Sequence, residues 1–138
     1  MSLQEESRRE IVKYRIERAF TALEQAKLNV KINCLEVTAN RLYYAAYYAV
    51  SSLLIAYQIP AHKHDGNIQQ FGLHFVKTGI VSRELGKLLR QLFTMRLTGD
   101  YSDHFDLVEE DVLPKIEPTE QFVHIITGLA KEKLGLLP

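Results

Sequence analysis

The chain has 138 residues, and its 17 basic and 17 acidic side chains give no formal net charge. This length suits a single domain, expected over 1–138 with frayed ends at 1–5 and 135–138, and is too short for two ordinary domains. The charge balance excludes the overall positive charge that is typical of a dedicated nucleic-acid-binding protein, but it permits a local basic groove. A charged beginning and a single cysteine predict a cytoplasmic protein without disulfides.

The first predicted element is a long helix from about residue 5 to residue 33. Its apolar residues recur in alternating steps of four and three, a heptad-like seam that should pack lengthwise against a neighbour. A polar break follows, in which Asn33 or Thr38 is expected to cap the next helix. Because this connection is short, the two helices should be antiparallel neighbours. The seam residues are Val12, Ile16, Ala19, Leu23, Ala26 and Val30.

The second predicted helix is the run from Asn40 to Tyr57, NRLYYAAYYAVSSLLIAY, which is apolar or aromatic around most of its surface. Such a helix is typically buried in the centre of a bundle or shared with a second subunit. Its clustered tyrosines favour a partly hydrated groove or interface, because each buried hydroxyl needs a partner. Core rings with hydroxyls at the rim are the simpler interpretation. Arg41 within the run argues against a membrane span.

Pro60 predicts the end of the second helix and the start of a loop. An Asp65–Gly66 turn is expected inside this loop. A short helix should then run from Ile68 to Thr78 and stop at Gly79.

A fourth helix is expected to begin at Ser82, to carry a second heptad-like seam and to be interrupted by Gly99. A last helical region should follow a cap at Asp106, contain Pro118 in a first turn and end near Leu134.

No segment alternates with a period of two, so the sequence predicts an all-α fold. The economical arrangement is an up-and-down antiparallel bundle of four principal helices plus one short helix. A basic stripe on the fourth helix is either ordinary surface or one wall of a phosphate-binding groove; it comprises Arg83, Lys87 and Arg90.

The polar segment from Arg96 to His104 is the strongest candidate for chemistry. Arg96 and Asp100 are four residues apart, so they can form an ion pair across one helical turn. That pair would account for both residues without any function. Alternatively, Arg96 holds a phosphate and His104 transfers a proton, as cleavage of an RNA chain by its own 2′-hydroxyl requires. His62 and His64 lack a nearby third ligand, so no metal or cofactor site is predicted.

Three motifs carry a family resemblance: NRLYYAAY at 40–47, HDG at 64–66 with FVKTG at 75–79, and Arg96-x-x-x-Asp100-Tyr101. Together they resemble the small bacterial and archaeal members of the HEPN family, the higher eukaryote and prokaryote nucleotide-binding domains. The similarity extends over nearly the whole chain. It implies a helical bundle that forms homodimers and holds nucleotide or RNA between its second and fourth helices. The groove residues so implied are Asn40, Arg41, Tyr44, Tyr48, Arg96, Asp100 and Tyr101.

The resemblance also implies partners and an activity. Many family members are encoded beside a minimal nucleotidyltransferase and act with it as toxin and antitoxin. Active members are metal-independent ribonucleases in which four to six residues separate an Arg from a His, whereas seven separate Arg96 from His104 here. Three interpretations stay open. The favoured one is a nucleotide- or RNA-binding module, and the others are an endoribonuclease using Arg96 and His104 and a non-catalytic dimeric interaction protein.

Overall fold

The computed structural model describes residues 2–61, 63–101 and 107–136, except the side chain at 101, and these residues form helices without a strand. The all-α prediction is therefore confirmed. The long helices are α1 (Leu3–Lys31), α2 (Leu35–Ala56), α4 (Arg83–Tyr101) and α6 (Ile116–Lys133). The short ones are α3 (Lys63–Phe71), continued by a π-helical turn (Gly72–Val76), and α5 (Glu109–Val112), continued by a 3₁₀ turn (Leu113–Lys115).

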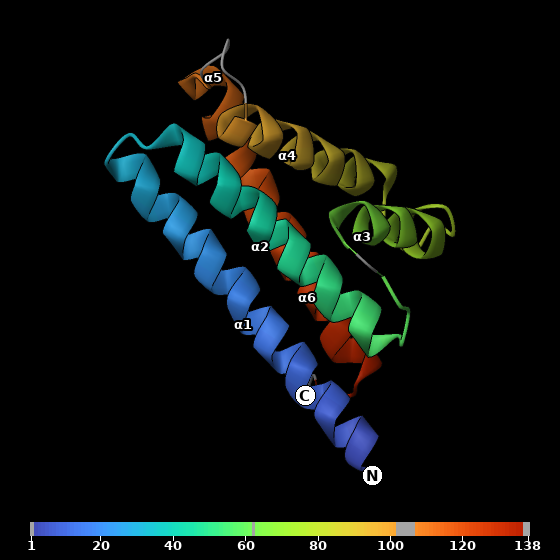
Figure 1. The fold of residues 1–138 in the computed structure, drawn as a ribbon. Coiled ribbons are helices and arrows are strands. Elements are labelled where there is room, and N and C mark those ends of the chain that lie inside the picture. Colours follow the sequence, from blue (N-terminus) through green and yellow to red (C-terminus); the bar gives the residue numbers. More distant parts are fainter. Residues whose placement is uncertain (1, 62, 102–106, 137–138) are drawn as a thin grey trace.

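α1 and α2 lie side by side and antiparallel, as predicted (Figure 1). The predicted seam of α1 is buried except for the half-buried Val30. The start of α1 is helical from Leu3, because the Ser2 hydroxyl accepts a hydrogen bond from the Glu5 N–H at 3.1 Å. Residues 3–5 form the first turn of this helix.

The predicted cap of α2 was wrong. The helix begins at Leu35, so Thr38 lies inside it and donates its hydroxyl to the Cys34 carbonyl at 3.1 Å. Asn33 instead adopts a left-handed φ of 57° in the connection from α1. A short polar side chain tolerates that conformation better than most residues, which explains its place in the tight link.

α2 is the central helix, as its apolar circumference predicted. It contacts α1, α3, α4, α5 and α6, while α6 lies behind it and α4 crosses its first half (Figure 1). Small side chains on α2 let neighbouring helices approach closely. These buried residues are Ala39, Ala45, Ala46, Ala49 and Ala56. Within the described ranges, no helix is both long and apolar enough to span a bilayer.

The expected turn at Asp65–Gly66 was also wrong, because α3 already begins at Lys63. Asp65 lies in the first turn of α3, where a carboxylate interacts favourably with the positive end of the helix dipole. This earlier start brings His64 onto a helix. The helical region ends at Val76, and Gly79, the predicted stop, follows it with a left-handed φ of 83°.

Gly99 does not interrupt α4, contrary to the prediction. The helix begins after Ser82, as expected, and continues through Gly99 to residue 101. A Cβ atom at Gly99 would lie 2.9 Å from Leu107 Cδ1 and 3.6 Å from Glu36 Cα. A Cβ atom here would therefore displace the end of the Leu107 side chain but would make only an ordinary contact with the start of α2. The unbroken helix keeps Arg96 and Asp100 on one face.

Replacing Gly99 with alanine should change the free energy of unfolding by less than about 0.5 kcal/mol, because displacement of the Leu107 side chain offsets the gain in helix propensity. Gly128 in α6 is the matched control, since nothing lies within 4 Å of a Cβ atom placed there. Gly128→Ala should stabilise the protein by roughly 0.5–1 kcal/mol. Urea denaturation of both variants measures the difference, and equal stabilisation by the two substitutions would show that Leu107 does not oppose a side chain at position 99.

The last helical region is divided into α5 and α6 by the 3₁₀ turn, which contains Pro114. Pro118 lies in the first turn of α6, and Leu134 caps the end of that helix, as predicted. Asp106 lies outside the described residues, and Val108 is the N-cap of α5. The basic stripe of α4 is exposed, with no ion pair to a carboxylate of the described segments.

Candidate functional site

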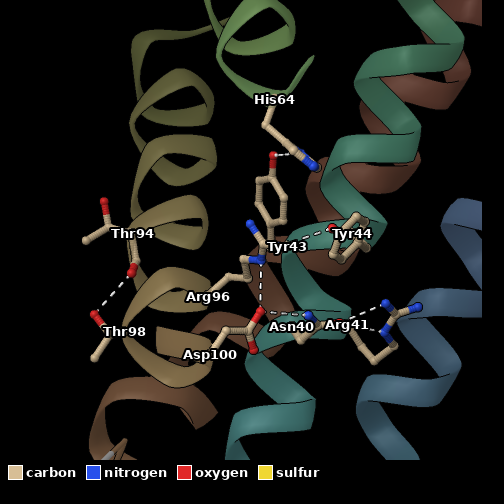
Figure 2. A network of polar contacts seen from close by, with 9 residues as sticks. All are labelled: Asn40, Arg41, Tyr43, Tyr44, His64, Thr94, Arg96, Thr98 and Asp100. Atoms are coloured by element: carbon tan, nitrogen blue, oxygen red, sulfur yellow. Dashed lines mark hydrogen bonds and ion pairs between the residues drawn. The ribbon is translucent and has the colours of Figure 1, made fainter. Parts of the chain in front are cut away.

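A network of polar side chains lies where α4 crosses α2 (Figure 2). One oxygen of Asp100, Oδ2, accepts hydrogen bonds from Arg96 Nε at 3.0 Å and from Asn40 Nδ2 at 3.2 Å. Arg96 also donates from Nη2 to the Tyr44 hydroxyl at 3.4 Å. The predicted ion pair between Arg96 and Asp100 is therefore present, and it connects α4 to two residues of α2.

Arg41 extends this network toward α1. Its Nε and Nη2 atoms donate to Asn40 Oδ1 at 3.0 and 2.7 Å, and its Nη1 donates to Gln25 Oε1 at 3.2 Å. The guanidinium carbon of Arg41 lies 5.0 Å from the centre of the Tyr44 ring, and that of Arg96 lies 5.5 Å from the same ring. One half-buried aromatic ring thus contacts two cations, each within the range of cation–π attraction.

His64 of α3 lies against the tyrosines on the other side of the network (Figure 2). Its Nδ1 is 2.7 Å from the hydroxyl of the fully buried Tyr43, and its ring centre is 4.6 Å from that of Tyr47. Burial raises the pKa of Tyr43 well above its usual range. Burial and then the charge of Arg96 lower the pKa of His64, although Asp65 opposes this shift. These two effects favour the neutral form of His64 beside the arginine.

The structure brings most of the predicted groove residues together. Asn40, Arg41, Tyr44, Arg96 and Asp100 share one network. Tyr48 lies one turn further along α2, with its ring centre 5.9 Å from that of Tyr44. The side chain of Tyr101 and all of His104 lie outside the described residues.

A family model described as the HEPN domain matches residues 12–132, and this range includes the entire network. The chain belongs to the HEPN family. The chain is 40% identical to a UPF0332 protein of Thermotoga maritima over 122 residues, which cover 88% of this chain and 92% of that protein. It is 30% identical to "Putative toxin MJ0605" of Methanocaldococcus jannaschii over 126 residues, which cover 91% of this chain and 93% of that protein.

His64 belongs to the site of this HEPN domain, although the sequence had predicted that it lies in a loop. The available signal was its place in the HDG motif, which contributed to the family resemblance. Three charged or polar residues of α1 were not expected near the site either. They are Gln25, which binds Arg41, and Arg15 and Arg18, which lie beside Tyr48. In the described ranges, no group of three potential metal-ligating side chains of His, Cys, Asp or Glu occurs.

The lowered pKa of His64 predicts a pH-dependent stability. A histidine whose folded-state pKa lies below the ordinary value of 6.5 contributes stability above that pH and loses it as the pH falls toward the folded-state pKa. The free energy of unfolding of the wild type should therefore fall more between about pH 7.5 and pH 5.5 than that of His64→Gln. Urea titrations at both pH values test this, and an equal fall in both proteins would contradict the prediction.

Proposed function

We propose that this HEPN domain is a nucleotide- or RNA-binding module and that its binding site is the network around Tyr44. The observation that supports it best is the packing of Arg41 and Arg96 against one half-buried tyrosine ring. Guanidinium groups bind phosphate through paired hydrogen bonds, and aromatic rings stack on bases. Arg41 is held by neutral amide oxygens, and no carboxylate of the described residues pairs with it, so the site retains positive charge.

We infer a toxin-like role in the cytoplasm, with a nucleotidyltransferase as the protein partner and a homodimer as the functional unit. Support comes from the relative named "Putative toxin MJ0605" and from the partners that the family resemblance implies. Sedimentation of the purified protein tests the dimer. A stable monomer at micromolar concentrations would count against it.

Fluorescence anisotropy with a labelled single-stranded RNA and a labelled mononucleotide, in EDTA, tests the binding function. Saturable binding that weakens as salt increases is expected, because phosphate contacts release counterions. Absence of saturable binding of both ligands at low salt would refute the proposal. Competition by unlabelled ligand distinguishes specific binding from adsorption of the dye.

A metal-independent endoribonuclease is the second candidate function. The sequence pattern pairs Arg96 with His104, and the contact of His64 with Tyr43 and Tyr47 supplies a second imidazole close to the site. A histidine that is neutral near pH 7 is suited to accept a proton from a ribose hydroxyl.

RNA cleavage in EDTA by the wild type and by Arg96→Ala, His64→Ala and His104→Ala would separate these roles. Loss of cleavage in Arg96→Ala and in one histidine variant, with circular dichroism unchanged, identifies the histidine that transfers the proton. If the wild type leaves varied RNAs intact, the protein is a binding module.

A further inference from the structure

We propose that the site continues from Tyr44 onto α1 as a track for single-stranded RNA, formed by Tyr48, Arg15 and Arg18. The proposal rests on the nucleotide- or RNA-binding function above. It specifies the ligand as an unpaired RNA strand several nucleotides long instead of a mononucleotide. It also assigns part of the binding to α1, which contains none of the motifs that resemble the HEPN family.

The contacts along the track repeat those at Tyr44. Arg18 Nη2 donates to the Tyr48 hydroxyl at 2.8 Å, and the Arg18 guanidinium carbon lies 5.0 Å from the centre of the Tyr48 ring. The guanidinium carbon of Arg15 lies 5.7 Å from the same ring. Tyr44 and Tyr48, one helical turn apart on α2 and with ring centres 5.9 Å apart, therefore each contact two arginines. This alternation of cation and ring runs from α4 across α2 to α1.

The arginines that face α2 and a row of glutamates lie on different sides of α1, and the glutamate side also carries Lys13 and Lys31. Successive helical residues are about 100° apart, so the arginines of α1 that face α2 share one side and a row of glutamates spaced by seven lies on the opposite side. The arginines are Arg8, Arg15 and Arg18, and the glutamates are Glu10, Glu17 and Glu24.

The arginines of the track are not neutralised by the segments that the structure describes. Neither Arg15 nor Arg18 forms an ion pair there, whereas Glu10 and Glu24 each pair with a lysine of α1. The Nε atom of Arg15 is buried without a hydrogen-bond partner in the same segments. Of the carboxylates in the described ranges, Asp100 is the one that is hydrogen-bonded to the network, and it is shared by Arg96 and Asn40. The track therefore carries an excess of positive charge.

The dimensions and the half-exposed rings favour an unpaired strand. Arg41 and Tyr48 are seven residues apart on α2, which corresponds to about 10 Å along the helix axis. With one phosphate per roughly 3.4 Å of a stacked strand, this length spans about three nucleotides. A mononucleotide would occupy only one end. Bases can stack on tyrosine rings only when they are not enclosed in a duplex.

The test compares an unstructured oligouridylate of about ten nucleotides, the same strand annealed to its complement, and UMP. Arg15→Gln/Arg18→Gln removes two charges from the track. Lys13→Gln/Lys31→Gln is the matched control, because it removes two charges from the opposite side of the same helix. Should the arginine double variant fail to fold, Arg18→Gln alone is used, since Arg18 is exposed. Thermal unfolding and sedimentation are recorded for every variant.

The arginine double variant should bind the single strand about tenfold more weakly. The slope of its log affinity against log salt concentration should be smaller in magnitude by roughly 1.4, which corresponds to the loss of two phosphate contacts. Its affinity for UMP and the lysine variant's affinity for the strand should stay within about twofold of the wild-type values. Tyr48→Leu should weaken binding of the strand, and Tyr48→Phe should restore it.

Three results would overturn the proposal while leaving the binding function intact. The first is an equal loss of affinity for the single strand in the arginine and lysine variants, and the second is a duplex that binds as tightly as the single strand. The third is a loss of affinity that occurs only when a dimer dissociates. The last result would instead identify this face as a contact between two copies of the chain. If the wild type binds neither UMP nor RNA, the proposed function itself fails, and the track fails with it.

Discussion

Arg96→Ala should weaken binding of nucleotide and RNA by roughly ten- to a hundredfold, because a charge-assisted hydrogen bond contributes about 1.5–3 kcal/mol. Arg96 contacts Asp100, the Tyr44 hydroxyl and the Tyr44 ring, so it is held at the centre of the site. Its planar fork can bind a phosphate through two hydrogen bonds while it stays against the ring. Anisotropy titrations with labelled RNA and mononucleotide measure the loss.

Arg96→Lys distinguishes charge from geometry. Lysine retains the positive charge but lacks the planar fork, so it should recover only part of the affinity. Arg90→Ala is the control on the same helix, because Arg90 is exposed and belongs to the stripe of α4 outside the network. Equal losses in Arg90→Ala and Arg96→Ala would mean that α4 attracts RNA only through its overall charge.

The sequence predicted the parts of this site that depend on helical spacing. The separation of four residues between Arg96 and Asp100 predicted their ion pair, which forms at 3.0 Å. The apolar circumference of α2 predicted its central place in the bundle, and the seam of α1 predicted the face that it buries. Each of these patterns depends on the period of a helix, which the residue types reveal directly.

Contacts between distant segments could not be predicted in the same way. His64 reaches Tyr43 only because α3 begins before the expected turn, and that start depends on how α3 packs against α2. Gly99 was expected to interrupt α4 because glycine weakens helices, but the helix continues through it to residue 101 and lies against Leu107. The role of α1 was missed for a similar reason: Gln25 and Arg18 meet α2 only after the helices pair.

Tyr43→Ala should reduce the free energy of unfolding by about 3–5 kcal/mol, as expected for truncation of a fully buried aromatic side chain. Tyr43 has no exposed surface, and its ring packs against Tyr47 and His64 as well as against Phe93 of α4. It therefore joins α2 to both α3 and α4. Urea denaturation followed by circular dichroism measures the loss.

Tyr43→Phe should cost much less, about 1 kcal/mol, because it preserves the ring and removes only the hydrogen bond to His64. Tyr14→Ala is the matched control, since Tyr14 is 54% exposed and its truncation should change stability by less than about 0.5 kcal/mol. If Tyr43→Ala cost no more than Tyr14→Ala, the ring would not join the helices.

Because Arg96 lies 5.9 Å from the Tyr43 ring, loss of that ring should also weaken RNA binding, even where the variant remains folded. The stability of the core and the position of the phosphate-binding arginine thus depend on the same side chain.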